Sequence, residues 1–126
     1  MGRQKSWLFD GTRGSEDEGY RVVEGHTTKL NADAQGKHIP GHRNYLSGRS
    51  IFLGSPADAQ ELIERFAGTG ERIGRGDYRE RIDFGKVIGV YIDSDTDEKL
   101  STTKGIIHYS KKGAHIVASR PKEEDD

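Results

Sequence analysis

Two histidines near the C-terminal end of the 126-residue chain have a spacing that could support acid–base chemistry. They lie in the segment 105–117, where strand-forming residues flank a lysine-rich turn, and this pattern predicts a β-hairpin turning at Lys112-Gly113. With a two-residue loop, Ser110 faces His115 and His108 faces Val117 across the hairpin. Strand alternation then separates a polar face from an apolar one. The polar face carries His108, Ser110, His115 and Ser119, and the apolar face carries Ile107, Tyr109, Ile116 and Ala118.

The loop length decides whether the two histidines share a face. A three-residue loop with a glycine bulge is also common for such a sequence, and it would place His108 and His115 on opposite faces. The two-residue loop is favoured because it keeps polar and apolar side chains apart.

Two imidazoles a few ångströms apart can serve as general base and general acid near neutral pH. Ribonucleases that work without a metal need such a pair, or substitutes for it. One group removes the proton from the ribose 2′-OH, the other protonates the departing 5′-oxygen, and cations stabilise the phosphorane charge. A single histidine is more often a surface or packing residue. Two histidines and a serine beside Lys104, Lys111 and Lys112 favour a functional site.

A second basic group occupies residues 37–50. Pro40-Gly41 predicts a tight turn between His38 and His42, and Arg49 could hold a phosphate through its planar guanidinium. The alternative is a solvated basic loop. A zinc site is less favoured than acid–base chemistry, because its ligands would come from distant segments without a ligand spacing. Those ligands would be His38, His42, His108 and His115.

Two further patterns favour a structural interpretation. Arg81 and Asp83 would be neighbours on one face of a strand, so ion pairing is preferred over phosphate binding by Arg81. Residues 93–98 resemble the start of a calcium loop, but the sixth position is Glu98 and the twelfth is Lys104. This segment is interpreted as an acidic turn between strands.

The elements that must position these residues are one secure helix and a set of later strands. Residues 55–67 predict a helix, with Ser55 as the N-cap and Pro56 in the first turn, and Gly68 ends it. A short strand is expected at 20–23 and a short helix near 30–35. From residue 83 onward the pattern changes to strands, expected at 87–92, 100–103, 105–110 and 114–118. The sum is an α+β fold, with an N-terminal helical or irregular part packed on a twisted antiparallel sheet.

Composition sets limits on the class of protein. There are 17 glycines and no cysteine, which favours a strand-rich fold and excludes disulfides, thiolate metal sites and cysteine nucleophiles. The net charge is -1, but residues 123–126 are all acidic, so the rest of the chain can carry a local basic face. No apolar run is long enough to predict a membrane anchor or a signal peptide.

Several blocks of the chain together resemble the bacterial polymorphic toxin type 50 domain. The last block, Thr102 to Val117, is long enough to be specific, and the resemblance covers about 29–121. The other blocks are 36–45, 48–50, 66–70 and 80–89. We therefore expect a leader or linker at 1–28, a toxin nuclease domain at 29–121 and an acidic tail at 122–126.

This resemblance carries expectations about fold and function. Such domains form the C-terminal part of contact-dependent growth inhibition proteins and of some phage head-associated proteins. They share a nuclease fold with barnase, EndoU, the tRNA-cleaving colicins and RelE. They resemble one another in being metal-independent ribonucleases, commonly directed at tRNA, that act in the cytoplasm of the target cell. A cognate immunity protein neutralises them in the producing cell, and no cofactor is implied.

The resemblance also implies site residues, and together with the hairpin it gives a mechanism that leaves a 2′,3′-cyclic phosphate. His108 and His115 are the expected acid and base, in an order left open, while Ser110 and Tyr109 orient groups or donate a proton. Tyr109 conflicts with the predicted register, which points its side chain into the core. The motif positions that match are His38, Arg49, His108, Tyr109, Ser110 and His115. His38 is also expected among the catalytic residues, as a group that helps to hold the scissile phosphate. The expected substrate contacts are Arg49, Lys104, His42, Arg81 and Lys111.

The pattern departs from the family at Ala118-Ser119, where Pro-Ala or Pro-Lys is expected, and this affects only the end of the last strand. The alternative function is a non-catalytic protein-binding module at the end of a larger surface or phage protein. A DNase is a third possibility, but it would need a metal, and the chain offers no convincing carboxylate cluster.

Overall fold

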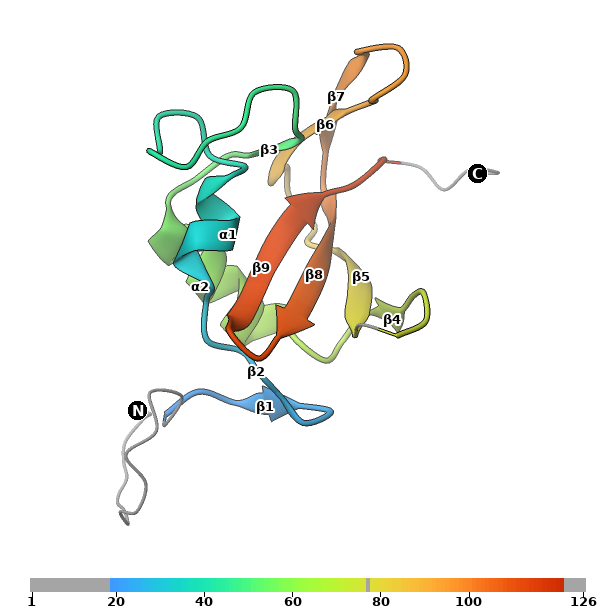
Figure 1. Cartoon of the computed structure of the whole chain (residues 1–126). Helices are drawn as coiled ribbons and strands as arrows, with labels where there is room; N and C mark the ends of the chain where they lie inside the picture. The colour runs from blue at the N-terminus through green and yellow to red at the C-terminus, as the bar shows by residue number, and fades with distance from the viewer. Residues whose placement is uncertain (1–18, 77, 122–126) are drawn as a thin grey trace.

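A computed structural model describes residues 19–76 and 78–121, which form three antiparallel sheets and two helices (Figure 1). The largest sheet has the strand order β4-β5-β8-β9, with β4 at Glu71–Arg72, β5 at Arg79–Asp83, β8 at Lys104–Ser110 and β9 at Gly113–Ala118. A second sheet has the order β3-β6-β7, with β3 at Ile51–Phe52, β6 at Gly89–Ile92 and β7 at Lys99–Thr102. The smallest pairs β1, Val22–Val23, with β2, His26–Thr27. The expected α+β class is confirmed.

Helix α2, Pro56–Phe66, forms where its sequence predicts it. The Ser55 hydroxyl accepts from the Asp58 amide at 3.1 Å, while the Asp58 carboxylate accepts from the Ser55 amide at 2.9 Å. This capping box satisfies backbone donors that a helix start leaves unpaired. The buried side of α2 contains Ala59, Leu62 and Ile63 and packs on β9. In Figure 1 this helix lies behind the four-stranded sheet, so the opposite face of the sheet is free of α2.

Helix α1, Ala32–Gly36, also lies near its expected place, beside the β9 edge of the sheet. Asn31 caps it by accepting from the Ala34 amide at 3.1 Å. No helix among the described residues is both long and apolar enough to cross a membrane.

The later strands agree with the prediction to within a few residues, but β5 was not expected as a whole strand. Its sequence, Arg-Glu-Arg-Ile-Asp, lacks the apolar alternation of a half-buried strand because Glu80 occupies a core position. Glu80 is only 1% exposed and is satisfied by hydrogen bonds from Gly68, Gly70 and Tyr109. A buried carboxylate with three donors is compatible with a core strand, but its sequence pattern does not reveal it.

The β8–β9 hairpin corrects the predicted register. Its two-residue loop is Lys111-Lys112, one residue earlier than expected, so His108 faces His115 and Ser110 faces Gly113. The Ser110 hydroxyl fixes this turn by accepting from the Lys112 amide and donating to the Gly113 carbonyl, both at 3.1 Å. Moving the loop by one residue changes the partner of each residue on the opposite strand by two, so that His108 faces His115 instead of Val117. The two faces remain as predicted, because a shift of two residues preserves the alternation of side chains.

Gly113 shows why the turn moves. Its φ is +125°, and a Cβ there would lie 2.6 Å from the Lys29 carbonyl oxygen. The segment 29–31 runs beside Ala114, which donates to the Lys29 carbonyl and accepts from the Asn31 amide, both at 2.8 Å. Gly113 therefore belongs to the strand, where only glycine leaves room for that neighbouring segment.

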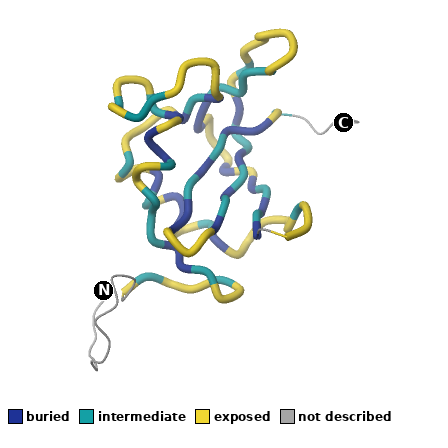
Figure 2. The backbone as a smooth tube through the Cα atoms, viewed as in Figure 1, coloured by how far each residue is buried: buried dark blue, intermediate teal, exposed yellow. Residues whose placement is uncertain are grey.

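The core lies between α2 and the apolar face of the large sheet, and Figure 2 shows buried residues along β8 and β9. Its members include Ile63, Ile107, Ile116 and Tyr109. Residues 19–28, within the predicted leader, contain the β1–β2 hairpin, where the His26 ring stacks on Tyr78 with centroids 5.2 Å apart. The rest of the predicted leader and the predicted tail, residues 1–18 and 122–126, lie outside the described residues.

Candidate active site

Three histidines form a row at the face of the large sheet that α2 leaves free. His108 and His115 lie on this face, and His38 lies beside it. The His108 and His115 rings stack with centroids 5.1 Å apart, and the His115 and His38 rings stack with centroids 6.0 Å apart. His108 comes from β8, His115 from β9, and His38 from the segment after α1. The prediction that His108 and His115 share one face is confirmed, and the observed register brings them directly opposite each other.

His38 is held in this row by β3 and its neighbour. Its ring Nδ1 lies 2.9 Å from the Ser50 carbonyl oxygen, and its own carbonyl accepts from the Phe52 amide at 2.8 Å. Because a carbonyl only accepts, Nδ1 must carry the hydrogen, which leaves Nε2 of the neutral ring as a proton acceptor. His38 is 6% exposed, so the surrounding chain fixes its ring.

Gln35 sets the distance between α1 and β9. Its side chain is fully buried and bonds to the backbone of Ile116 twice, donating to the carbonyl at 2.9 Å and accepting from the amide at 2.8 Å. The amide thus replaces the next strand at this edge of the sheet. Since Gln35 precedes His38 by three residues and Ile116 follows His115, this contact brings the two histidines together.

Burial determines the protonation state of the His115 and His38 rings. Burial, followed by repulsion from the protonated forms of His108 and His38 and from Lys37, lowers the pKa of His115 to about 4. Burial also lowers the pKa of His38; the bond to Ser50 opposes this, while Arg49 and Lys37 add to it. His115 is therefore neutral at pH 7 and can accept a proton.

Arg79 continues the row on the next strand, and the sequence prediction missed it. In the β5–β8–β9 register, Arg79 faces His108, which in turn faces His115, so the three residues share one face. The charged residues Arg79, Arg81 and Asp83 alternate with Glu80 and Ile82. This alternation with a period of two was the signal in the sequence that could have predicted the strand. It can be recognised only if Glu80 is accepted as a core residue.

The other predicted cations lie farther along the same face or at its ends. Arg81 faces Ile106, one alternation beyond the Arg79–His108 pair, and Lys104 faces Asp83 at the far end of β8. Lys111 lies in the exposed hairpin turn. Arg49 is exposed and close enough to His38 to affect its pKa.

Tyr109 and Ser110 are engaged elsewhere. Tyr109 is 4% exposed on the core face, where its hydroxyl donates to Glu80. Burial, with the Glu80 carboxylate adding to it, raises the pKa of the Tyr109 hydroxyl. The Ser110 hydroxyl is occupied by the turn that it stabilises. The structure thus brings neither side chain into the histidine row.

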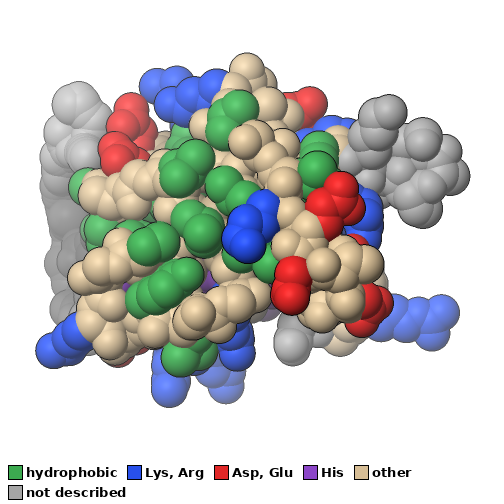
Figure 3. All heavy atoms as spheres, turned by 90° about the horizontal axis from the view of Figure 1, so that it is seen from above, with side chains coloured by type: hydrophobic (Ala, Val, Ile, Leu, Met, Phe, Trp, Pro, Cys, Tyr) green, Lys and Arg blue, Asp and Glu red, His purple; other side chains and the backbone are tan. Residues whose placement is uncertain are grey.

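His42 has a local role in the loop after α1. Its ring lies over Gly36, where a Cβ would be 2.3 Å from Nδ1, and Nδ1 accepts from the Asn44 amide at 3.0 Å. Figure 3 shows the end of the molecule seen from above, where apolar side chains gather around basic ones.

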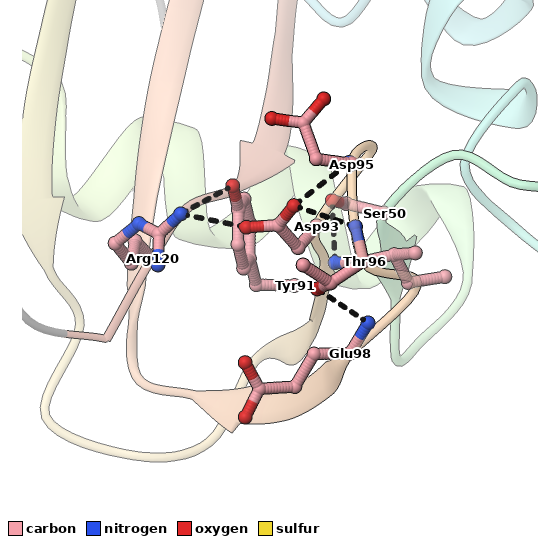
Figure 4. Close-up of polar contacts among 8 residues, drawn as sticks. Ser50, Tyr91, Asp93, Asp95, Thr96, Glu98 and Arg120 are labelled. Atoms are coloured by element: carbon pink, nitrogen blue, oxygen red, sulfur yellow. Dashed lines mark hydrogen bonds and ion pairs between the residues drawn. The ribbon is translucent and has the colours of Figure 1, made fainter.

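The described part of the chain contains no group of three or more side chains arranged to hold a metal ion. The segment 93–98, which resembled a calcium loop, forms the turn between β6 and β7 (Figure 4). There Asp93 accepts from the Asp95 and Thr96 amides and, at 2.8 Å, from the Arg120 guanidinium. Its carboxylate is therefore used to fix the turn and the end of β9.

The sequence was also compared with known proteins. No curated protein matches it. The family model described as bacterial toxin 50 matches residues 30–118, which include the whole row from His38 through Arg79 and His108 to His115. This match covers most of the chain, so the chain belongs to the bacterial toxin 50 family.

Proposed function

We propose that this toxin domain is a metal-independent RNA endonuclease. The observation that supports this most strongly is the stacked pair of His108 and His115 on the free face of the sheet. Two imidazoles at this distance can act on the two oxygens that exchange at one phosphorus atom. An antiparallel sheet with a helix on its other face agrees with a fold of the barnase, EndoU and RelE kind, which we propose for this chain.

The proposed reaction transfers the phosphoryl group within the RNA. Neutral His115 accepts the proton of the ribose 2′-OH as that oxygen forms a bond to the adjacent phosphorus. The bond between phosphorus and the 5′-oxygen then breaks, and the 5′-oxygen takes a proton from protonated His108. The products are a 2′,3′-cyclic phosphate and a 5′-hydroxyl. The bound phosphodiester raises the basicity of His115, since a nearby anion favours the protonated ring.

In this proposal His38 orients His115, the general base. Its ring stacks on His115 from the side opposite His108, and its own position is fixed by Ser50. The cations on the sheet face, with Arg49 at its edge, attract the RNA backbone and hold it along the sheet. The substrate we propose is tRNA, as the family resemblance implies.

The biological setting follows from the family. We propose that the domain is delivered into competing bacteria as the C-terminal part of a secreted or cell-surface protein. A cognate immunity protein then protects the producing cell. Because the face that carries the histidines also carries basic residues, an immunity protein covering it should present an acidic patch.

The deciding experiment incubates the purified chain with total bacterial RNA in excess EDTA. We expect discrete cleavage products ending in 2′,3′-cyclic phosphate, and no cleavage by His108→Ala or His115→Ala proteins with wild-type circular dichroism spectra. Intact RNA with the wild-type chain would contradict the proposal and favour the binding-module alternative. Cleavage lost only in EDTA would instead indicate metal-dependent chemistry.

A further inference from the structure

The Arg79 side chain is held in place by the hairpin between β4 and β5. The Arg79 carbonyl accepts from the Ile73 amide at 3.0 Å, which closes this hairpin. Guanidinium Nη2 occupies the space where Gly74 would carry a side chain, since a Cβ there would lie 2.0 Å from Nη2. Gly74 has a φ of +74°, which suits glycine. The guanidinium therefore lies against this hairpin, over Gly74.

The charge of Arg79 has no carboxylate partner within residues 19–76 and 78–121. Its Nε is buried and makes no hydrogen bond in that part of the chain. By contrast, Arg120 pairs with Asp93 at 2.8 Å, and Arg65 lies 3.6 Å from Glu61. Nε is closed to solvent, but Arg79 as a whole is only half-buried, so a bound anion would contact other atoms of the guanidinium.

The strand register places Arg79 closer to His108 than the other cations on this face. Neighbouring strands are about 4.8 Å apart, and Arg79 lies directly opposite His108. Arg81 is two residues farther along β5, about 7 Å at 3.4 Å per residue. Lys104 is four residues from His108, about 14 Å along β8. Arg79 is thus the cation whose strand position is nearest to the acid–base pair.

We infer that Arg79 binds the scissile phosphate of the RNA, an inference that rests on the proposed ribonuclease function. The planar guanidinium donates to the non-bridging phosphate oxygens while His108 and His115 act on the 5′- and 2′-oxygens. As negative charge grows on these oxygens in the phosphorane, the fixed cation stabilises it more than it stabilises the substrate. Gly74 matters because it leaves room for this position of the guanidinium.

The first experiment uses inorganic phosphate as the probe, so that it does not depend on RNA cleavage. Phosphate is titrated into the wild-type chain while the imidazole signals of His108 and His115 are followed by NMR. We expect saturable shifts in the wild type and binding at least about tenfold weaker in Arg79→Gln, because charge-assisted hydrogen bonds are lost. Arg65→Gln, which removes the same charge from α2, should bind phosphate like the wild type.

Two further variants separate phosphate binding from a structural role of Arg79. Gly74→Ala keeps every charge but displaces the guanidinium, so it should also weaken phosphate binding. Arg79→Lys keeps the charge without the planar fork and should bind with intermediate affinity. In RNA cleavage, Arg79→Gln should lower kcat/KM about 100-fold or more.

The outcomes distinguish the two proposals. Wild-type shifts that do not saturate with phosphate, or that are unchanged in Arg79→Gln, would overturn the inference. Phosphate binding that depends on Arg79 in a chain that cleaves no RNA would overturn the ribonuclease function and leave an anion site beside the histidines.

Discussion

Glu80 ties three separate parts of the fold together, and its removal should be among the most costly single changes in the domain. Its side chain is 1% exposed, and its two carboxylate oxygens accept from three donors. The Gly68 amide donates to one oxygen at 2.8 Å, the Gly70 amide donates to the other at 2.9 Å, and the Tyr109 hydroxyl donates to the first. These contacts join the loop after α2 to β5 and to β8, next to His108.

The expected loss in the free energy of unfolding depends on how many hydrogen-bond donors each substitution leaves without an acceptor. Hydrogen bonds to a charged group contribute about 1.5–3 kcal/mol each, and buried donors without a partner cost about 1–3 kcal/mol. Because Glu80→Ala orphans all three donors and the surroundings relax in part, we expect a loss of about 4 kcal/mol. Tyr109→Phe removes only one donor, and Gly68 still bonds to the same oxygen, so we expect about 2 kcal/mol.

The assay is equilibrium unfolding in urea followed by far-ultraviolet circular dichroism, which reports the free energy of unfolding. Exposed Glu64→Ala in α2 is the control and should change stability by less than about 0.5 kcal/mol. Adding Tyr109→Phe to Glu80→Ala should cost nothing more, because the hydroxyl has already lost its acceptor. A Glu80→Ala protein within about 1 kcal/mol of the wild type would refute this reasoning.

Three other changes test separate parts of the structure. Burial holds the pKa of His115 at about 4, below its ordinary 6.5, so the unfolded chain binds this proton more readily. Stability should therefore fall by up to about 3 kcal/mol as the pH drops from 6.5 to 4, and His115→Gln should flatten this dependence in urea titrations. Gly113→Ala should lower the free energy of unfolding by at least about 2 kcal/mol, because Gly113 has a φ of +125° and approaches Lys29 closely. The control is Gly41→Ala, where φ is +93° but the surrounding space is open, and it should cost only about 1 kcal/mol in the same unfolding assay. Arg120→Ala breaks an exposed ion pair, so it should cost less than about 1 kcal/mol, yet hydrogen exchange should show faster opening of the turn at 93–98. Unchanged exchange in that turn would contradict the role assigned to Arg120.

The sequence by itself was sufficient for features that depend on neighbours along the chain. The N-cap Ser55 and the apolar stripe predict α2, because helix capping and periodicity act within a few residues. Strand alternation also placed His108 and His115 on one face, opposite Tyr109. That prediction survived a wrong register because the pairing moved by an even number of residues, which exchanges partners without exchanging faces.

Only the tertiary structure decided which side chains meet. Gln35 bonds to Ile116 across 81 residues of sequence, and this contact brings His38 to His115. The position of Arg79 opposite His108 depends on β5, whose core residue is the charged Glu80. Such a strand is stable only when donors from distant loops satisfy the carboxylate, and those donors become neighbours only once the chain has folded.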